Sequence, residues 1–168
     1  MEAARHGCYI NDNDVAPSMA KTLIRHAVTA DFDTLLQIDQ ASFARNVAYN
    51  ANELSYFMRR AGAETIVLEE DGKIVAFLIL EVHNTRRSGT IVTLDVRETH
   101  RRSGYGTRLL KRAENILAEY GAEVYDLQVD VNNRSAIRFY KKHGLRRVRT
   151  IPHYYANGND AYLMVKEL

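Results

Sequence analysis

The most informative pattern of apolar and polar positions lies in the middle of the chain. Apolar and β-branched residues over 91–96 predict a buried strand. From Tyr105 onward, apolar residues recur at helical spacing, which predicts an amphipathic helix that stops at Gly121. Two glycines, Gly104 and Gly106, lie between these elements. This strand, turn and helix form the unit around which the rest of the chain is organised.

The first half of the chain predicts a strand, two helices and a hairpin. Residues 21–28 alternate well enough for a strand, and residues 29–43 combine N-cap candidates with helical apolar spacing. A short second helix is expected over 52–60. Two apolar runs within 64–82 are joined by an Asp-Gly pair, which is a strong hairpin signal. Residues 44–51 have no strong period and are a candidate substrate loop.

The second half predicts a strand, a helix and two closing strands. Residues 123–131 alternate as a strand, and the succession of strand, helix and strand implies a parallel crossover. Asn132 and Asn133 are cap candidates for another helix, which ends near Gly144. The closing strands are expected at 145–150 and 160–166. The fold class is therefore α+β, with one mixed sheet.

Length and composition indicate a single soluble domain. The 168 residues are enough to bury a sizeable core, and we expect the domain to span 21–168. Residues 1–20 lack the apolar run of a cleaved signal and are expected to be a loose extension. No apolar run approaches the ~18 residues that a membrane span requires. The lone Cys8 excludes an intramolecular disulfide and fits a reducing compartment, so we expect a cytoplasmic location.

The charge balance does not indicate nucleic acid as the main partner. A net charge of +2 is too mild, although basic clusters occur at 101–102, 141–143 and 146–149. Nucleic-acid binding through these clusters is the weakest of the alternatives. The six histidines are scattered and none lies at ligand spacing from the cysteine, so no metal is expected. The oligomeric state stays open between monomer and homodimer.

The turn between the central strand and its helix has the features of an anion site. Gly104 and Gly106 let the backbone approach a ligand without an intervening Cβ. A helix that starts there offers unpaired N–H groups and the positive end of its dipole. Arg101 and Arg102 add charge-assisted contacts, and the Thr107 hydroxyl adds a hydrogen-bond donor. The Walker and dinucleotide motifs are excluded because the former's Gly-Lys-Ser/Thr and the latter's third glycine are missing.

Three segments resemble the GCN5-related N-acetyltransferase (GNAT) superfamily, and the resemblance runs from about residue 21 to the C-terminus. Residues 101–106 match its acetyl-CoA signature, Arg/Gln-x-x-Gly-x-Gly/Ala. Residues 127–144 match its second signature, Asn-x-x-Ala-x-x-x-Tyr-x-x-x-Gly. Residues 154–164 resemble the Tyr-Tyr-x-x-Gly-x-Asp-Ala-Tyr-x-Met segment of the RimI-like branch, which acetylates protein N-termini.

The resemblance implies a mixed, mostly antiparallel sheet of about seven strands flanked by about four helices. The central strand would splay from its parallel neighbour, and acetyl-CoA would bind in the opening as cosubstrate. Backbone groups of the central strand would pair with the pantetheine arm, and one N–H would polarise the thioester carbonyl. The residues expected to bind acetyl-CoA are Leu94, Asp95, Val96, Arg101, Arg102, Ser103, Gly104, Tyr105, Gly106, Thr107, Asn133 and Tyr140.

The motif match makes Tyr140 the candidate general acid, because a phenol near the sulfur can protonate the departing thiolate. The general base is harder to assign. RimI-like enzymes carry a glutamate twelve residues before the tyrosine, and this chain has Gln128 there, which cannot accept the proton. Glu81 and His83 are candidates, and so is Asp95.

Tyr154 and Tyr155 are expected to contact the acceptor, and they offer a further alternative in which they hold a water that acts as base. A weak base favours an α-amine, whose pKa is about 8, over a lysine side chain, whose pKa is about 10.4. We therefore expect direct acetyl transfer to a protein or peptide N-terminus. Two alternatives stay open: acetylation of a small-molecule amine or amino acid, and an acyl-CoA sensor without turnover.

Overall fold

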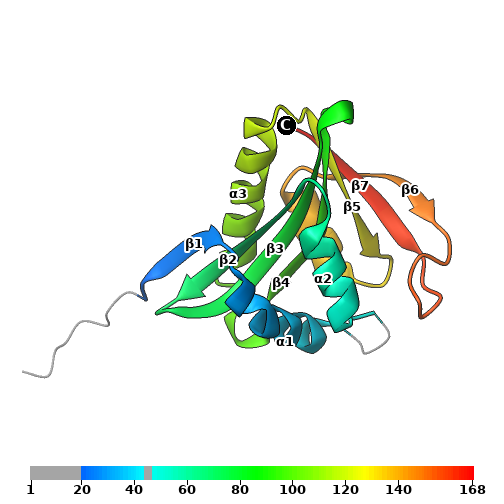
Figure 1. Cartoon of the computed structure of the whole chain (residues 1–168). Coiled ribbons are helices and arrows are strands. Elements are labelled where there is room, and N and C mark those ends of the chain that lie inside the picture. Colours follow the sequence, from blue (N-terminus) through cyan, green and yellow to red (C-terminus); the bar gives the residue numbers. More distant parts are fainter. Residues whose placement is uncertain (1–19, 44–46) are drawn as a thin grey trace, which may run out of the picture.

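The computed structural model describes residues 20–43 and 47–168, so most of the expected N-terminal extension and residues 44–46 of the candidate substrate loop lie outside the described residues. Figure 1 shows one twisted sheet with α3 on the side opposite α1 and α2. The seven strands follow the order β1-β2-β3-β4-β5-β7-β6. This confirms the predicted mixed sheet of seven strands with four helices.

The elements agree with the predicted ones to within a few residues. The strands are β1 (Thr22–His26), β2 (Ala63–Glu70), β3 (Lys73–His83), β4 (Ser88–Val96), β5 (Val124–Asp130), β6 (Arg146–Ile151) and β7 (Ala161–Glu167). The helices are α1 (Phe32–Ser42), α2 (Ala51–Arg59), α3 (Tyr105–Glu119) and α4 (Arg134–Lys142).

The central strand β4 begins earlier than its apolar pattern predicts. The apolar pattern predicts this strand over 91–96, yet β4 starts at Ser88 and pairs there with His83 of β3. Ser88 also pairs with Val124 of β5, so this end of β4 has partners on both sides. Backbone hydrogen bonding to two neighbours outweighs the polar side chains of this segment.

Strands β4 and β5 form the parallel pair, and they pair only briefly. Residues Ser88–Thr90 pair with Val124–Asp126, and no further residues of the two strands pair. A bulge helps β4 to diverge: Thr93 lies opposite Ile79, whereas Ile91 lies opposite Leu80, which leaves Val92 as an extra residue. The predicted splay of the central strands is thus confirmed.

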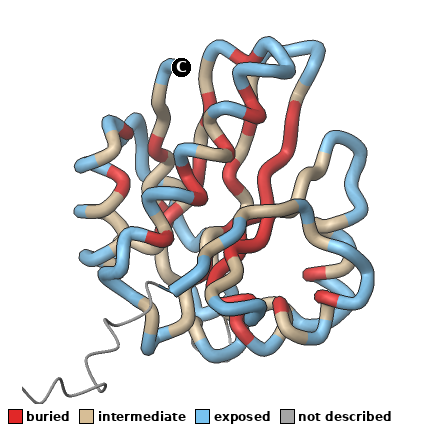
Figure 2. The backbone as a smooth tube through the Cα atoms, turned by 90° about the vertical axis from the view of Figure 1, so that its left-hand side faces the viewer, coloured by how far each residue is buried: buried red, intermediate tan, exposed pale blue. Residues whose placement is uncertain are grey.

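The two faces of the sheet carry separate apolar clusters. One cluster joins the central strands to α3, where Leu109, Ala113 and Leu117 are completely buried, and α4 packs at its edge. The other joins β2 and β3 to α1 and α2 through Leu35, Leu54 and neighbouring residues. Figure 2 shows the buried residues concentrated along the central strands and the inner faces of the helices. The splay therefore opens between two packed layers.

Gly89 lies where the paired part of β4 meets α3. A Cβ at this position would lie 2.2 Å from Cδ2 of Leu117 and 3.2 Å from the carbonyl oxygen of Glu81. Gly89→Ala should therefore lower the free energy of unfolding by about 1–3 kcal/mol through overpacking. Urea denaturation measures this change.

The control is a double-mutant cycle with Leu117→Ala. Leu117→Ala alone should cost about 2–5 kcal/mol because it leaves a cavity. In the double variant the added methyl group should fill part of that cavity, so the combined loss should be smaller than the sum. Strictly additive losses would contradict the direct contact.

Candidate active site

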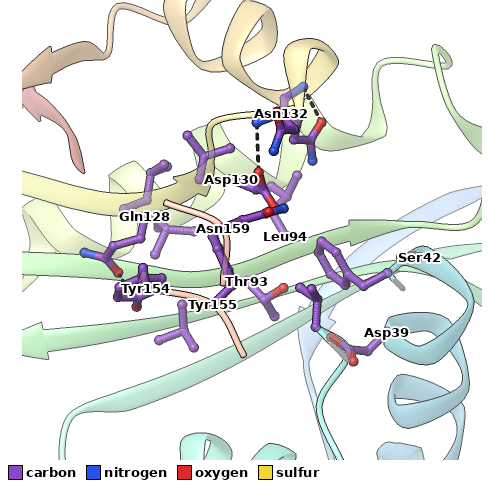
Figure 3. A pocket seen from close by; sticks show the side chains of 18 of the residues that line it. Asp39, Ser42, Thr93, Leu94, Gln128, Asp130, Asn132, Tyr154, Tyr155 and Asn159 are labelled. Atoms are coloured by element: carbon purple, nitrogen blue, oxygen red, sulfur yellow. Dashed lines mark hydrogen bonds between the residues drawn. The ribbon is translucent and has the colours of Figure 1, made fainter. Parts of the chain in front are cut away.

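A cavity of about 420 Å³ lies between the splayed strands, a volume within the range of small-ligand pockets. Its walls are residues 91–94 of β4 and 127–130 of β5, with contributions from α1, α4 and the loop before β7. Figure 3 shows Gln128 and Tyr154 at one end of the cavity, Asp39 and Ser42 of α1 at the other, and Thr93 between them.

Beyond Thr90, the edge of β4 that faces the splay carries backbone groups that β5 does not bond. The N–H of Arg97 donates to the carbonyl oxygen of Val75, which places this residue's polar groups on the β3 side. Because successive residues of a strand point their backbone groups to opposite sides, Leu94 and Val96 direct theirs toward the splay. The Val96 carbonyl accepts a 3.3 Å bond from Nε of Arg101. The β4 edge could pair with an extended ligand, as the family resemblance implies for pantetheine.

The turn before α3 exposes the start of the helix. Gly104 is the N-cap residue, and its φ of 81° is in the left-handed region that favours glycine. No side chain caps this end, so the first N–H groups of α3 are available to a ligand. Arg101, Arg102 and Ser103 are exposed beside them. The turn therefore has the geometry and charge for an anion such as pyrophosphate.

Two residues of the predicted cradle use their side chains elsewhere, and a third is a glycine in a packing position. Tyr105 is buried and donates a hydrogen bond to Glu70, so only its backbone faces the turn. The Thr107 hydroxyl lies 3.0 Å from Nε2 of His143. A Cβ on Gly106 would lie 3.4 Å from Phe139, which makes it a packing position between α3 and α4. The contribution of these residues to cofactor binding stays a prediction.

Tyr140 of α4 lines the cavity, and its side chain is otherwise buried. Burial, followed by the negative charge of Asp95, raises the pKa of the phenol well above its ordinary value. The phenol therefore stays protonated at neutral pH, which suits a proton donor. Asn133 also lines the cavity, but its Oδ1 caps α4 by accepting a 3.1 Å bond from the Ala136 N–H.

Two predicted base candidates, Glu81 and His83, do not line the cavity. Glu81 is buried and its Oε2 lies 3.1 Å from Nη1 of Arg60. His83 places its Nε2 3.0 Å from the Thr90 hydroxyl, and its Nδ1 lies 3.8 Å from Glu81. The structure thus brings the two residues together where β4 and β5 still pair, apart from the cavity.

A chain of hydrogen bonds runs from Thr90 to Tyr154 at one end of the cavity. The Thr90 hydroxyl donates to Oδ1 of Asp126 at 3.2 Å, and Nε2 of Gln128 donates to the same oxygen at 3.3 Å. Oε1 of Gln128 accepts a 3.3 Å bond from the Tyr154 hydroxyl. An amide can serve both neighbours at once, whereas a second carboxylate would be repelled by Asp126. Gln128 therefore positions Tyr154.

Tyr154 and Tyr155 are held at the cavity by the loop before β7. The N–H of Tyr155 donates to the Asn159 carbonyl at 3.1 Å, and the Tyr155 carbonyl accepts from the Gly158 N–H at 2.8 Å. The two rings pack edge to face with centroids 5.0 Å apart. Both tyrosines line the cavity, where their rings can pack against an acceptor.

Asp39, which lines the cavity from α1, was not predicted as a site residue from the sequence. Its side chain is completely buried, and its Oδ2 accepts a 2.7 Å bond from the Tyr49 N–H. Burial raises the pKa of this carboxyl to about 6. One signal was available: Asp39 follows Ile38 and lies four residues after Leu35, so it falls on the apolar face of the helix.

Among the described residues, no group of three or more His, Cys, Asp or Glu side chains could hold a metal ion. No helix within 20–43 and 47–168 is both long and apolar enough to cross a membrane.

Comparisons with known proteins agree with this geometry. The chain is 34% identical over 160 residues to an N-alpha-acetyltransferase of Sulfurisphaera tokodaii, covering 86% of this chain and 92% of that protein. The crystal structure of Ard1 from Thermoplasma volcanium superposes with a TM-score of 0.80 at 26% identity, over 88% of this chain and 97% of that one.

The Escherichia coli ribosomal-protein-S18-alanine N-acetyltransferase shares the fold, with a TM-score of 0.77 at 23% identity over 88% of this chain and 94% of that one. Residues 20–145 match the model of the acetyltransferase (GNAT) family. With a splayed strand pair, an uncapped helix start and a matching family model over most of its length, the chain belongs to the acetyltransferase (GNAT) family.

Proposed function

We propose that this chain transfers the acetyl group of acetyl-CoA directly to the α-amine of a protein or peptide N-terminus. The cavity between β4 and β5 carries the proposal, because its wall includes residues 91–94 of β4, the strand that leads to the anion-binding start of α3, and the acidic side chain of Asp39. Relatives named N-alpha-acetyltransferase that align over most of the chain support the choice of acceptor.

The residues present fit acetyl-CoA. The thioester supplies an activated acetyl group, and the free N–H groups at the start of α3 would hold the pyrophosphate. The unpaired edge at Leu94 and Val96 would align the pantetheine arm, leaving the thioester near Tyr140. The Tyr140 phenol would give its proton to the departing sulfur.

The tyrosine-rich walls favour an amine that arrives as a cation. Tyr49, Tyr154 and Tyr155 all line the cavity, and aromatic faces attract cations. An α-ammonium loses its proton near pH 8, whereas a lysine side chain does so near 10.4, so an α-amine is easier to activate at neutral pH. Assignment to the RimI-like branch belongs to this proposal and rests on the resemblance of residues 154–164. Cytoplasmic location and a monomeric or homodimeric state stay predictions.

The first test measures coenzyme A thiol release with a panel of short peptides that differ in their first residue. Turnover should require a free α-amine, so the same peptides with blocked N-termini should be inactive even when they contain lysine. Polyamines and free amino acids complete the panel. Turnover with these alone would favour the small-molecule alternative, and acetyl-CoA binding without any turnover would favour the sensor.

Replacing Tyr140 by Phe removes the proposed acid while keeping the ring in the core. We expect kcat to fall by about 100-fold or more, the usual size of a general-acid contribution, with little change in the Kd for acetyl-CoA. Steady-state kinetics and calorimetry measure the two quantities. Tyr120→Phe, at an exposed tyrosine at the end of α3, is the matched control and should keep full activity. An unchanged kcat in Tyr140→Phe would refute the acid assignment.

Gly104→Ala tests the cradle. A Cβ there meets nothing within 4 Å, but the φ of 81° is unfavourable for alanine by about 1–2 kcal/mol, which should displace the start of α3. We expect the Kd for acetyl-CoA to rise about tenfold, equivalent to about 1.4 kcal/mol.

Gly72→Ala is the matched control, because Gly72 in the β2–β3 turn has a φ of 76° and equally open surroundings. Both variants should lose similar stability, and only Gly104→Ala should weaken binding. Equal affinities for acetyl-CoA in the two variants would contradict the cradle.

A further inference from the structure

Asp39 stands out among the acidic residues at the cavity. Of the described residues that line it, only Asp39 and Asp130 carry a carboxyl group. Both oxygens of Asp130 are bonded, Oδ1 to the Asn132 N–H at 2.8 Å and Oδ2 to the Asn159 amide at 2.7 Å. Oδ1 of Asp39 has no hydrogen-bond partner, although the side chain is completely buried. A buried polar atom without a partner is costly, and a hydrogen-bond donor carried by a ligand in the cavity would satisfy it.

A second buried carboxyl group lies behind the cavity wall. Asp95 of β4 is 1% exposed, and its Oδ2 accepts a 2.8 Å bond from the hydroxyl of Thr93, which lines the cavity. Oδ1 of Asp95 also has no partner. The two acids are near enough for the charge of Asp39 to raise the pKa of Asp95. This end of the cavity thus holds two buried acids and lacks a bonded cation for Asp39 among the described residues.

We propose that Asp39 is the catalytic residue that receives the proton of the acceptor's α-ammonium group. The inference rests on the proposed function and deepens it. A cationic amine entering from the cavity would give the unpartnered Oδ1 its missing hydrogen-bond donor. The wall formed by α1 and β4 would then supply the base that β5 lacks, since β5 carries Gln128 in place of a glutamate.

The protons balance in this scheme. One proton moves from the ammonium nitrogen to the Asp39 carboxylate, and the freed lone pair forms the N–C bond to the acetyl carbon. The C–S bond breaks, and the sulfur takes the proton of Tyr140. The second proton lost by the nitrogen restores the phenol. Asp39 then releases its proton to solvent, so one proton is produced per acetyl group transferred.

The surroundings of Asp39 raise its pKa toward neutral pH, which suits a base. Burial raises its pKa to about 6, the N–H of Tyr49 opposes this shift, and the charge of Glu53 on α2 adds to it. From β4, Asp95 has its own pKa raised to about 7, mainly by burial and then by Asp39, while Thr93, Arg101 and the hydroxyl of Ser42 on α1 lower it. Tyr49, Tyr154 and Tyr155 stay neutral in this range, since burial raises each pKa above its ordinary value. A base with a pKa near the working pH transfers protons efficiently.

The test is the pH profile of kcat/KM for an N-terminal peptide, measured with wild type and Asp39→Asn. Wild-type activity should fall as the pH drops through about 6, because Asp39 becomes protonated. The variant lacks this base and can use only acceptor molecules whose α-amine is already deprotonated. Its activity should therefore rise toward about pH 8, the pKa of the α-amine. At pH 7 the variant should be slower by about 100-fold or more, and at pH 9 the gap should narrow to less than about tenfold.

Three controls separate chemistry from folding. Asp39→Asn keeps an acceptor for the Tyr49 N–H, so its melting temperature and its Kd for acetyl-CoA should stay close to wild type. Asp33→Asn changes an exposed acid on the same helix and should leave the pH profile of kcat/KM unchanged. Asp95→Asn should keep the fall in activity near pH 6, because Asp39 is still present.

The outcomes are distinguishable. An active wild type with an Asp39→Asn profile of unchanged shape, merely scaled down or not changed at all, would overturn the inference and leave the proposed function standing. Loss of the pH 6 transition in Asp95→Asn alone would transfer the role to Asp95 and overturn the assignment to Asp39. A wild type that binds acetyl-CoA but acetylates no peptide would overturn the proposed function and the inference together.

Discussion

The brief pairing of β4 with β5 is the constraint on which the site depends. The two strands share three residue pairs, at Ser88–Thr90 and Val124–Asp126, and then separate. Each strand is paired along its other edge, β4 with β3 and β5 with β7, so the two facing edges border the opening. The backbone groups of β4 that β5 leaves unpaired need partners, and an extended ligand can supply them. The unpaired part of β4 and β5 thus forms the binding site.

Two layers hold this opening in shape. On one face, α3 packs directly on the paired part of β4 through Leu117 and Gly89. On the other, α1 packs against β3 and brings Asp39 to the end of the cavity. Residues 97–104 join the end of β4 to the start of α3, so the open strand edge leads directly to the anion-binding helix start. Binding and chemistry therefore share one rigid frame.

The sequence predicted the fold well because its signals are local. Apolar periodicity, the Asp71-Gly72 turn and the glycines near α3 each depend on neighbours in the chain, and each predicted element is present. The start of β4 was predicted a few residues too late. Ser88 pairs with residues of two other strands, and no local sequence pattern indicates such pairing.

The candidate site was predicted less completely, for the same reason. The motif residues Gly104 and Tyr140 lie at the turn and the cavity as expected. Asp39 was missed because the sequence cannot tell whether an acid on a helix faces a neighbour or a void. Glu81 was proposed as a base from its position in a strand, but its partner Arg60 comes from the segment after α2, twenty-one residues earlier in the chain.

The two buried acids, Asp39 and Asp95, lower the stability of the folded state at neutral pH. An ordinary aspartate has a pKa of 3.8, and Asp39 reaches about 6 in the folded chain. Between these values the folded state holds a proton that the unfolded state has released, so raising the pH through this range favours unfolding. Asp95, with its pKa raised to about 7, acts in the same direction. An apolar pair would avoid this loss of stability at neutral pH, whereas the proposed deprotonation of an ammonium group in the cavity requires a carboxylate with an unpartnered oxygen.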